Sequence, residues 1–228
     1  MRETAFHDPH ATAEPAAPVR TPRTNNPQRT MDDILAVATR EFAERGLSGA
    51  RIDAIAESTQ TSKRMIYYYF GSKKGLYLAV LEKAYQDIRD IETESHLETL
   101  APEEALRTLV AFTFDHHFAN PEFIRLVANE NLHRGEFLAQ STTIRELNAT
   151  AITTLSAICE RGIQAGVFRP GIDALDLHMS ISSLCVFNVA NRHTFSLIFK
   201  FDFDDPQTIA QRRESVVDMV MRFVRLPG

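Results

Sequence analysis

The sequence has no long apolar run. No stretch approaches the ~18 consecutive apolar residues that a membrane-spanning helix requires, and the N-terminus lacks the basic-then-apolar pattern of a secretory signal. Even so, 44% of the 228 residues are apolar, which is enough to bury a core. We therefore expect a globular protein of the cytoplasm with no membrane partner.

Cysteine is scarce, and the two that occur are not spaced as a metal or redox motif. Cys159 and Cys185 both lie in apolar helical patterns. We therefore expect buried, reduced thiols rather than a disulfide or a metal site.

Motifs for catalysis are also missing. The sequence contains no glycine-rich phosphate loop, no GxSxG and no Cys/His arrangement for a nucleophile. The adjacent histidines His116 and His117 would point to different faces of one helix, so they should not converge on a metal ion. The sequence accordingly predicts no enzyme, no cofactor and no metal site.

Strand-like alternation is absent as well, apart from an apolar run at 197–203. Lys200 and Asp202 interrupt that run, which we interpret as a helix end and loop. Elsewhere apolar residues recur every three to four positions, and residues such as Pro102 and Gly46 mark helix starts and ends. The predicted fold is all-α, with helices over about 30–46, 52–59, 62–69, 72–96, 102–119, 121–133, 141–165, 173–199 and 206–225.

Charge is unevenly distributed along the chain. The net charge of −5 by itself argues against a protein that binds nucleic acid. Residues 17–85 nevertheless carry 11 Lys and Arg against 7 Asp and Glu, whereas residues 86–228 carry 13 against 20. A basic N-terminal unit on an acidic body is the asymmetry expected when one module meets phosphate.

The stretch 59–73 places hydroxyl groups, cations and three consecutive tyrosines on one short predicted helix. It follows the helix at 52–59 after a three-residue turn, which is a helix-turn-helix arrangement. Ile66 and Phe70 lie one turn apart and should face the core. The outer arc carries side chains that can bond base edges or phosphates, namely Lys63, Arg64, Tyr67 and Tyr68.

Two helix N-termini in this stretch should also favour phosphate. Ser62 and Ser72 stand where backbone N–H groups are free, and Lys73 adds a full charge beside Ser72. The alternative is a solvated, charged helix end whose tyrosines reach toward water.

Three spaced motifs carry a resemblance that covers roughly residues 28–82: Phe42-x3-Gly46, Ile52-x2-Ile55-Ala56, and Ser62-x3-Ile66-Tyr67-x-Tyr69-Phe70-x-Ser72-Lys73-x2-Leu76. Together they resemble the DNA-binding domain of the TetR family of bacterial transcriptional regulators. The resemblance implies an all-α homodimer, a palindromic operator and a helical C-terminal domain that binds a small molecule and loosens the grip on DNA. It also implies that Lys63 and Arg64 face bases, and that the phosphates are held by Ser62, Tyr67, Tyr69 and Lys73.

Three positions depart from the family pattern. Gln60 replaces the usual turn glycine, so a left-handed backbone there would cost ~1 kcal/mol. Ala50 replaces a common hydroxyl residue ahead of the second helix, which removes an N-cap. Lys74 stands where an acid is common, which weakens the fit to the helix dipole but adds phosphate affinity.

We predict three segments: a disordered tail over 1–27, a helix-turn-helix DNA-binding domain over 28–75, and a helical ligand-binding and dimerisation domain over 76–228. The tail is rich in proline and nearly free of large apolar residues. Its Arg20 and Arg23 either follow a DNA groove or remain solvated without a role.

Residues 86–228 contain no local motif, but aromatic and polar side chains gather in several of the predicted helices. Such helices can enclose an apolar cavity with a few directed polar groups, as a small-molecule site requires. The alternative is that the phenylalanines fill an ordinary core and that each histidine is satisfied or at the surface. The residues that we predict for the pocket are Phe112, His116, Asn129, His133, Phe187, Asn188 and Asn191.

The last two predicted helices, about 173–199 and 207–225, have apolar faces that suit either a two-fold four-helix interface or a domain core. These faces consist of Leu177, Ile181, Leu184, Cys185, Val216, Val220, Phe223 and Val224. The family resemblance favours the dimer.

The function predicted from these features is a homodimeric, ligand-responsive transcriptional regulator, namely a repressor that a small organic effector releases from its operator. The phenylalanines, amides and histidines of the C-terminal body favour an aromatic or heteroaromatic effector. The alternatives are an activator, a regulator without a ligand, and a helical small-molecule carrier or enzyme with a vestigial DNA-binding domain.

Overall fold

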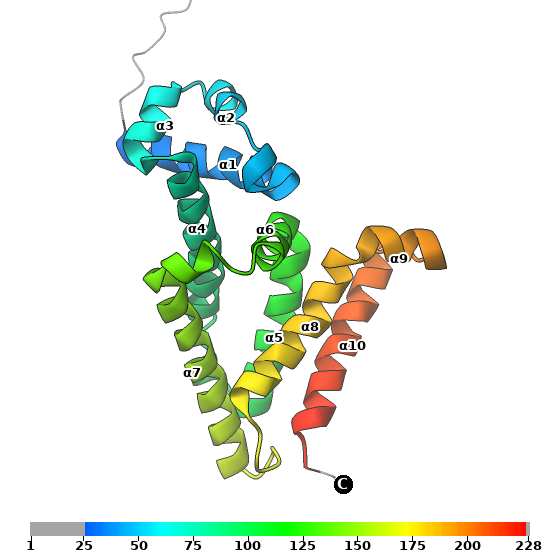
Figure 1. Ribbon diagram of the computed structural model, residues 1–228. Coiled ribbons are helices and arrows are strands. Elements are labelled where there is room, and N and C mark those ends of the chain that lie inside the picture. The colour runs from blue at the N-terminus through cyan, green and yellow to red at the C-terminus, as the bar shows by residue number, and fades with distance from the viewer. Residues whose placement is uncertain (1–25, 227–228) are drawn as a thin grey trace, which may run out of the picture.

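The computed structural model describes residues 26–226, whose regular elements are helices, apart from one isolated antiparallel bridge between Phe168 and Arg225 (Figure 1). The all-α prediction is therefore confirmed. The described residues form ten α-helices and two 3₁₀ turns: α1 Pro27–Gly49, α2 Ile52–Ser58, α3 Lys63–Phe70, α4 Lys73–Glu94, η1 Leu97–Thr99, α5 Pro102–Ala119, α6 Pro121–Leu132, η2 Leu138–Gln140, α7 Thr142–Gln164, α8 Ala174–Ala190, α9 Arg192–Phe199 and α10 Pro206–Val224.

The N-terminal helices α1, α2 and α3 form a small unit at one end of the molecule (Figure 1). Its core is built by fully buried apolar side chains from each helix and from the start of α4, including Ile34, Phe42, Ile55, Ile66 and Leu76. Their three- to four-residue spacing gives each helix one apolar face, and burying these faces together fixes the angle at which α3 is presented.

The long helix α4 leaves this unit and runs along the body, where it packs against α7 (Figure 1). In the body, α5 lies centrally and packs against α7, α8 and α10. A second core forms there, with Leu106, Phe114, Leu155, Ile181 and Val220 all buried. Two helices, α4 and α6, therefore connect the ends of the molecule, because both pack against α1.

Several helix ends differ from the sequence prediction. The first helix begins at Pro27, since the Asn26 side chain accepts the backbone N–H groups of Gln28 and Arg29 as an N-cap. Asn26 and Pro27 belong to the tail that was predicted over 1–27. The rest of that tail, including Arg20 and Arg23, lies outside the described residues. The predicted helix 173–199 is two helices, α8 and α9, that break at Asn191.

Other expected boundaries are confirmed. Gly46 breaks the helical path of α1 with φ 63° and ψ 176°, a left-handed region that glycine enters without a Cβ clash. The apolar run at 197–203 is a helix end and loop, because α9 ends at Phe199 and Lys200 follows with φ 52°. Cys159 and Cys185 are buried free thiols, and burial raises the pKa of each, to about 11 and about 12.

The apolar faces assigned to a dimer interface lie mostly inside the chain. Most of the named residues are buried in the core shared with α5 and α7, namely Leu177, Ile181, Cys185, Val216, Val220 and Val224. Leu184 packs against that core, and Phe223 is exposed. The domain-core alternative is therefore correct for these faces. None of the described helices is long and apolar enough to span a membrane.

Candidate nucleic-acid interface and ligand cavity

The turn between α2 and α3 leads into the predicted recognition helix, α3. Gln60 has φ 52°, so the non-glycine residue bears the left-handed backbone that the sequence predicted. Ser62 then caps α3, its Oγ accepting the Met65 N–H at 3.2 Å. Ile66 is fully buried and Phe70 is half-buried, which confirms that this face of α3 anchors the helix.

The opposite face of α3 is open to solvent. Tyr67 and Tyr68 are 44% and 76% exposed, and Lys63 and Arg64 are exposed beside them. The Lys63 ammonium pairs with the Asp53 carboxylate of α2. Arg64 has no hydrogen bond or ion pair among the described residues. Its five N–H donors are thus available to an external partner.

The remaining residues predicted to contact phosphate lie at the end of α3 and around the start of α4. Tyr69 is half-buried and packs edge-on against Tyr68, with ring centroids 5.3 Å apart. The Ser72 Oγ accepts the Gly75 N–H at 3.0 Å and caps α4. The Lys73 Nζ donates to the Ser48 carbonyl at 3.2 Å, which ties the start of α4 to the end of α1.

The two other departures from the family pattern have local explanations. Ala50 is buried, and α2 begins without a side-chain cap at its N-cap residue Arg51, as predicted. The Arg51 backbone N–H is instead accepted by the Glu41 carboxylate at 3.0 Å. Lys74 turns toward the body, with its Nζ 3.9 Å from Glu136 and 5.4 Å from the centre of the Phe137 ring.

A cavity of about 390 Å³ lies inside the body. The helices α4, α5, α6, α7 and α8 all contribute to its walls. Most of the lining is apolar, with a few polar groups: Tyr85, Ile88, Arg89, Glu92, Leu109, Phe112, Thr113, His117, Phe123, Ile124, Val127, Ala128, Asn131, Asn148, Ala151, Leu155, His178, Ile181, Ser182, Val186 and Ala190. A concave, mostly apolar space with a few polar groups is typical of a small-molecule site.

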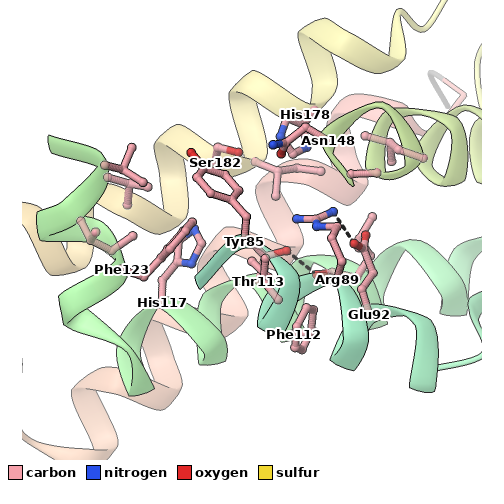
Figure 2. A pocket seen from close by; sticks show the side chains of 18 of the residues that line it. Tyr85, Arg89, Glu92, Phe112, Thr113, His117, Phe123, Asn148, His178 and Ser182 are labelled. Atoms are coloured by element: carbon pink, nitrogen blue, oxygen red, sulfur yellow. Dashed lines mark hydrogen bonds and ion pairs between the residues drawn. The ribbon is translucent and has the colours of Figure 1, made fainter. Parts of the chain in front are cut away.

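The polar groups of the cavity are poorly solvated. Arg89 and Glu92 form an ion pair one turn apart on α4, with both side chains largely covered, at 13% and 10% exposed (Figure 2). His117 is 4% exposed, and its Nδ1 has no hydrogen-bond partner among the described residues. Burial, followed by the nearby His116, Arg89 and His178, lowers the pKa of His117 to about 4. Burial and Arg89 also lower the pKa of His178.

Of the seven residues predicted for the pocket, Phe112 lines this cavity. His116 does not line this cavity but a second hollow of about 600 Å³, which lies between α1, α4, α5 and α6. Asn129 faces α1, where its Nδ2 donates to the Phe42 carbonyl at 3.4 Å. His133 is exposed at the end of α6.

The other three predicted residues lie toward the far end of α8. Phe187 is exposed and packs edge-on against Phe195. Asn188 is buried, but its Oδ1 accepts Arg212 Nε at 3.1 Å and its Nδ2 donates to the Leu184 carbonyl. Asn191 is exposed where α8 ends. The structure therefore does not bring the predicted set together around one cavity.

The sequence reasoning missed the charged and polar residues at the centre of the cavity. Arg89 and Glu92 carry no distinguishing signal in the sequence, because other charged residues of the same helix, such as Asp87 and Asp90, flank the same apolar positions. His178 is far from them in sequence and meets them only through the packing of α8 on α5. Among the described residues, no cluster of His, Cys, Asp and Glu could hold a metal ion.

Comparison with known proteins agrees with this architecture. Residues 34–80 match the family described as "Bacterial regulatory proteins, tetR family", and residues 102–220 match "Tetracyclin repressor-like, C-terminal domain". The chain is 38% identical over 203 residues to the HTH-type transcriptional repressor NicS of Pseudomonas putida, covering 89% of this chain and 96% of that protein.

Two further proteins from Streptomyces coelicolor are similar. The HTH-type transcriptional repressor SCO4008 is 31% identical over 153 residues, covering 67% of this chain and 74% of that protein. The crystal structure of the transcriptional regulator SCO4942 superposes with a TM-score of 0.66 at 26% identity, covering 87% of this chain and 99% of the other. The chain belongs to the TetR family of bacterial transcriptional regulators.

Proposed function

We propose that this regulator is a cytoplasmic homodimeric repressor, which holds a palindromic operator through α3 and releases it when a small organic molecule fills the cavity. The observation that carries the proposal is that α4 and α6 form walls of the cavity and also pack against α1. A molecule in the cavity therefore touches the helices on which the DNA-binding unit rests.

The residues of α6 divide between these two roles. Phe123, Val127 and Asn131 line the cavity. Asn129 faces α1 from the same helix, and the buried Leu126 belongs to the N-terminal core. A tilt of α6 to admit a ligand is thus transmitted to α1, because a packed core cannot deform without moving its neighbours.

In a dimer, such a movement changes the distance between the two DNA-binding units. The outward faces of α8 and α10 retain exposed apolar side chains after the intrachain core is complete, namely Leu175, Met179, Phe187, Met219 and Phe223. Pairing these faces about a two-fold axis would fix the distance between two copies of α3. Because half-sites lie whole helical turns apart, at ~34 Å each, a small change in that distance abolishes simultaneous docking.

A reporter gene tests the sign of regulation. DNA from upstream of the regulator's own gene and its neighbours is placed before the reporter in a foreign bacterial host. Expression of the regulator should lower the reporter signal, and Arg64→Ala should restore it. An unchanged signal from every fragment, or a signal that the regulator raises, contradicts the proposal.

A further inference from the structure

Of the described residues that line the cavity, Arg89 is the one Lys or Arg, and only part of its guanidinium is hydrogen-bonded. Its Nη1 pairs with Glu92, whereas its Nε is buried without a hydrogen-bond partner (Figure 2). No residue among those described bonds to Nη2. Nε and Nη2 form one edge of the planar guanidinium, with two parallel N–H groups spaced to match the two oxygens of a carboxylate.

Leaving this edge of the guanidinium without a hydrogen-bond partner costs free energy. A buried donor without a partner loses its hydration and gains nothing in exchange, and the loss is larger for a charged group. The neighbouring amides do not satisfy this edge. The Nδ2 groups of Asn131 and Asn148 donate to the Val127 and Ile144 carbonyls of their own helices, and among the described residues neither Oδ1 accepts from Arg89 Nε. A ligand can therefore supply the acceptor that this edge of Arg89 has not found within the chain.

The surrounding charges favour an acceptor with one negative charge. Among the described residues, Glu92 is the one acidic side chain that lines the cavity, and Arg89 and two histidines, His117 and His178, line it as well. Both histidines have lowered pKa values, so they are neutral at pH 7 and can donate one N–H each. A single cation with one free edge suits a monoanion, whereas a phosphate dianion would bring more charge than this wall balances.

The rest of the cavity suits a flat, apolar group. Tyr85 and Phe123 meet edge-to-face, with centroids 5.2 Å apart, and Phe112 closes the same space. We propose that the cavity binds a small single-ring aromatic carboxylate, whose ring lies among Tyr85, Phe112 and Phe123 and whose carboxylate takes the free Nε–Nη2 edge of Arg89. This inference rests on the proposal that the cavity is the effector site.

Calorimetric titration of the full, DNA-free chain tests the proposed ligand class. The probes are benzoate and the three monohydroxybenzoates, each compared with its own amide, which has the same shape but no charge. At least one acid should bind the wild type about tenfold or more tightly than its amide. Arg89→Lys keeps a charge but removes the two-pronged edge, so it should abolish that preference. Glu92→Gln should strengthen it, because Arg89 then has no competing carboxylate.

Three results would overturn the inference: no acid binds, every amide binds as tightly as its acid, or Arg89→Lys retains the preference. Arg222→Lys, an exposed arginine on α10, is the matched control and should behave as the wild type. Ligand-free operator binding by Arg89→Lys reports whether the variant folds. Failure of operator binding by the wild type, with the carboxylate preference intact, would contradict the regulatory proposal and leave this inference standing.

Discussion

Arg64 and Lys63 are neighbours in sequence, but the fold holds them differently. The Lys63 ammonium pairs with Asp53 of α2, whereas Arg64 is exposed and has no partner among the described residues. Composition alone cannot distinguish the two, because the pairing depends on how α2 and α3 cross. A free guanidinium on the open face of α3 is the group best placed to bond a guanine edge.

Removing this side chain should reduce sequence discrimination rather than overall attraction to DNA. Arg64→Ala is expected to weaken specific operator binding by ~1–3 kcal/mol and to leave binding to unrelated DNA nearly unchanged. Fluorescence anisotropy on operator and scrambled duplexes at one salt concentration measures both. Equal losses on the two duplexes would mean that Arg64 contacts phosphates only.

His117 links the cavity to the stability of the fold. Burial, then His116, Arg89 and His178, lower its pKa to about 4, below the ordinary value of 6.5. Between these two pKa values, His117 is protonated in the unfolded chain but not in the folded chain. The free energy of unfolding therefore falls as the pH drops from about 6.5 toward 4.

This group alone should reduce the free energy of unfolding by about 2 kcal/mol between pH 7 and pH 5. Urea denaturation at several pH values should show a smaller fall for His117→Asn than for the wild type. His133→Asn, on an exposed histidine, is the control and should follow the wild-type curve. Parallel curves for His117→Asn and the wild type would show that His117 titrates normally.

At the scale of the helices, one residue near the end of α7, Gly162, lies in close contact with the Phe168 ring. A Cβ added to Gly162 would lie 1.9 Å from the Phe168 ring, which is itself buried against α7. Gly162 also accepts the backbone N–H groups of Val167 and Phe168 at 3.0 and 3.1 Å. The glycine therefore lets the chain fold back after α7 and insert a phenylalanine into the core.

Gly162→Ala should therefore destabilise the protein, although alanine is the better helix former. Forcing an extra methyl group into this contact costs ~1–3 kcal/mol, measured as the free energy of unfolding in urea. Gln164→Ala, an exposed change in the same turn of α7, should have an effect near zero. A stabilised Gly162→Ala variant would mean that Phe168 has room to move aside.

The helices themselves were largely predictable, but the way they meet was not. Periodicity and the proline at its start identified 102–119, and α5 has those bounds. The break at Asn191 was missed because apolar residues continue on both sides of it. Within α6, Asn129 was chosen for the pocket but faces α1, whereas Asn131, two residues away, lines the cavity. Residue type alone does not show which face of a helix packs against which neighbouring helix.

For the whole molecule, the unpaired apolar faces of α8 and α10 predict assembly. Met179→Glu places a charge on the outward face of α8, where Met179 is exposed in the single chain. Sedimentation velocity should show a monomer, and operator affinity should fall with it, because burying that unpaired charge is costly. Leu132→Glu, on an exposed leucine at the end of α6, should remain dimeric. A dimeric Met179→Glu variant would locate the interface elsewhere.

The central claim is that the dimer reads a palindrome through α3, and selection from random DNA tests it most directly. Repeated rounds of binding to the full chain should enrich two inverted half-sites whose centres lie one or more whole helical turns, ~34 Å each, apart. Arg64→Ala should lose the preference at one base pair in each half-site. Enrichment of no sequence, with binding that varies only with salt, would contradict the account.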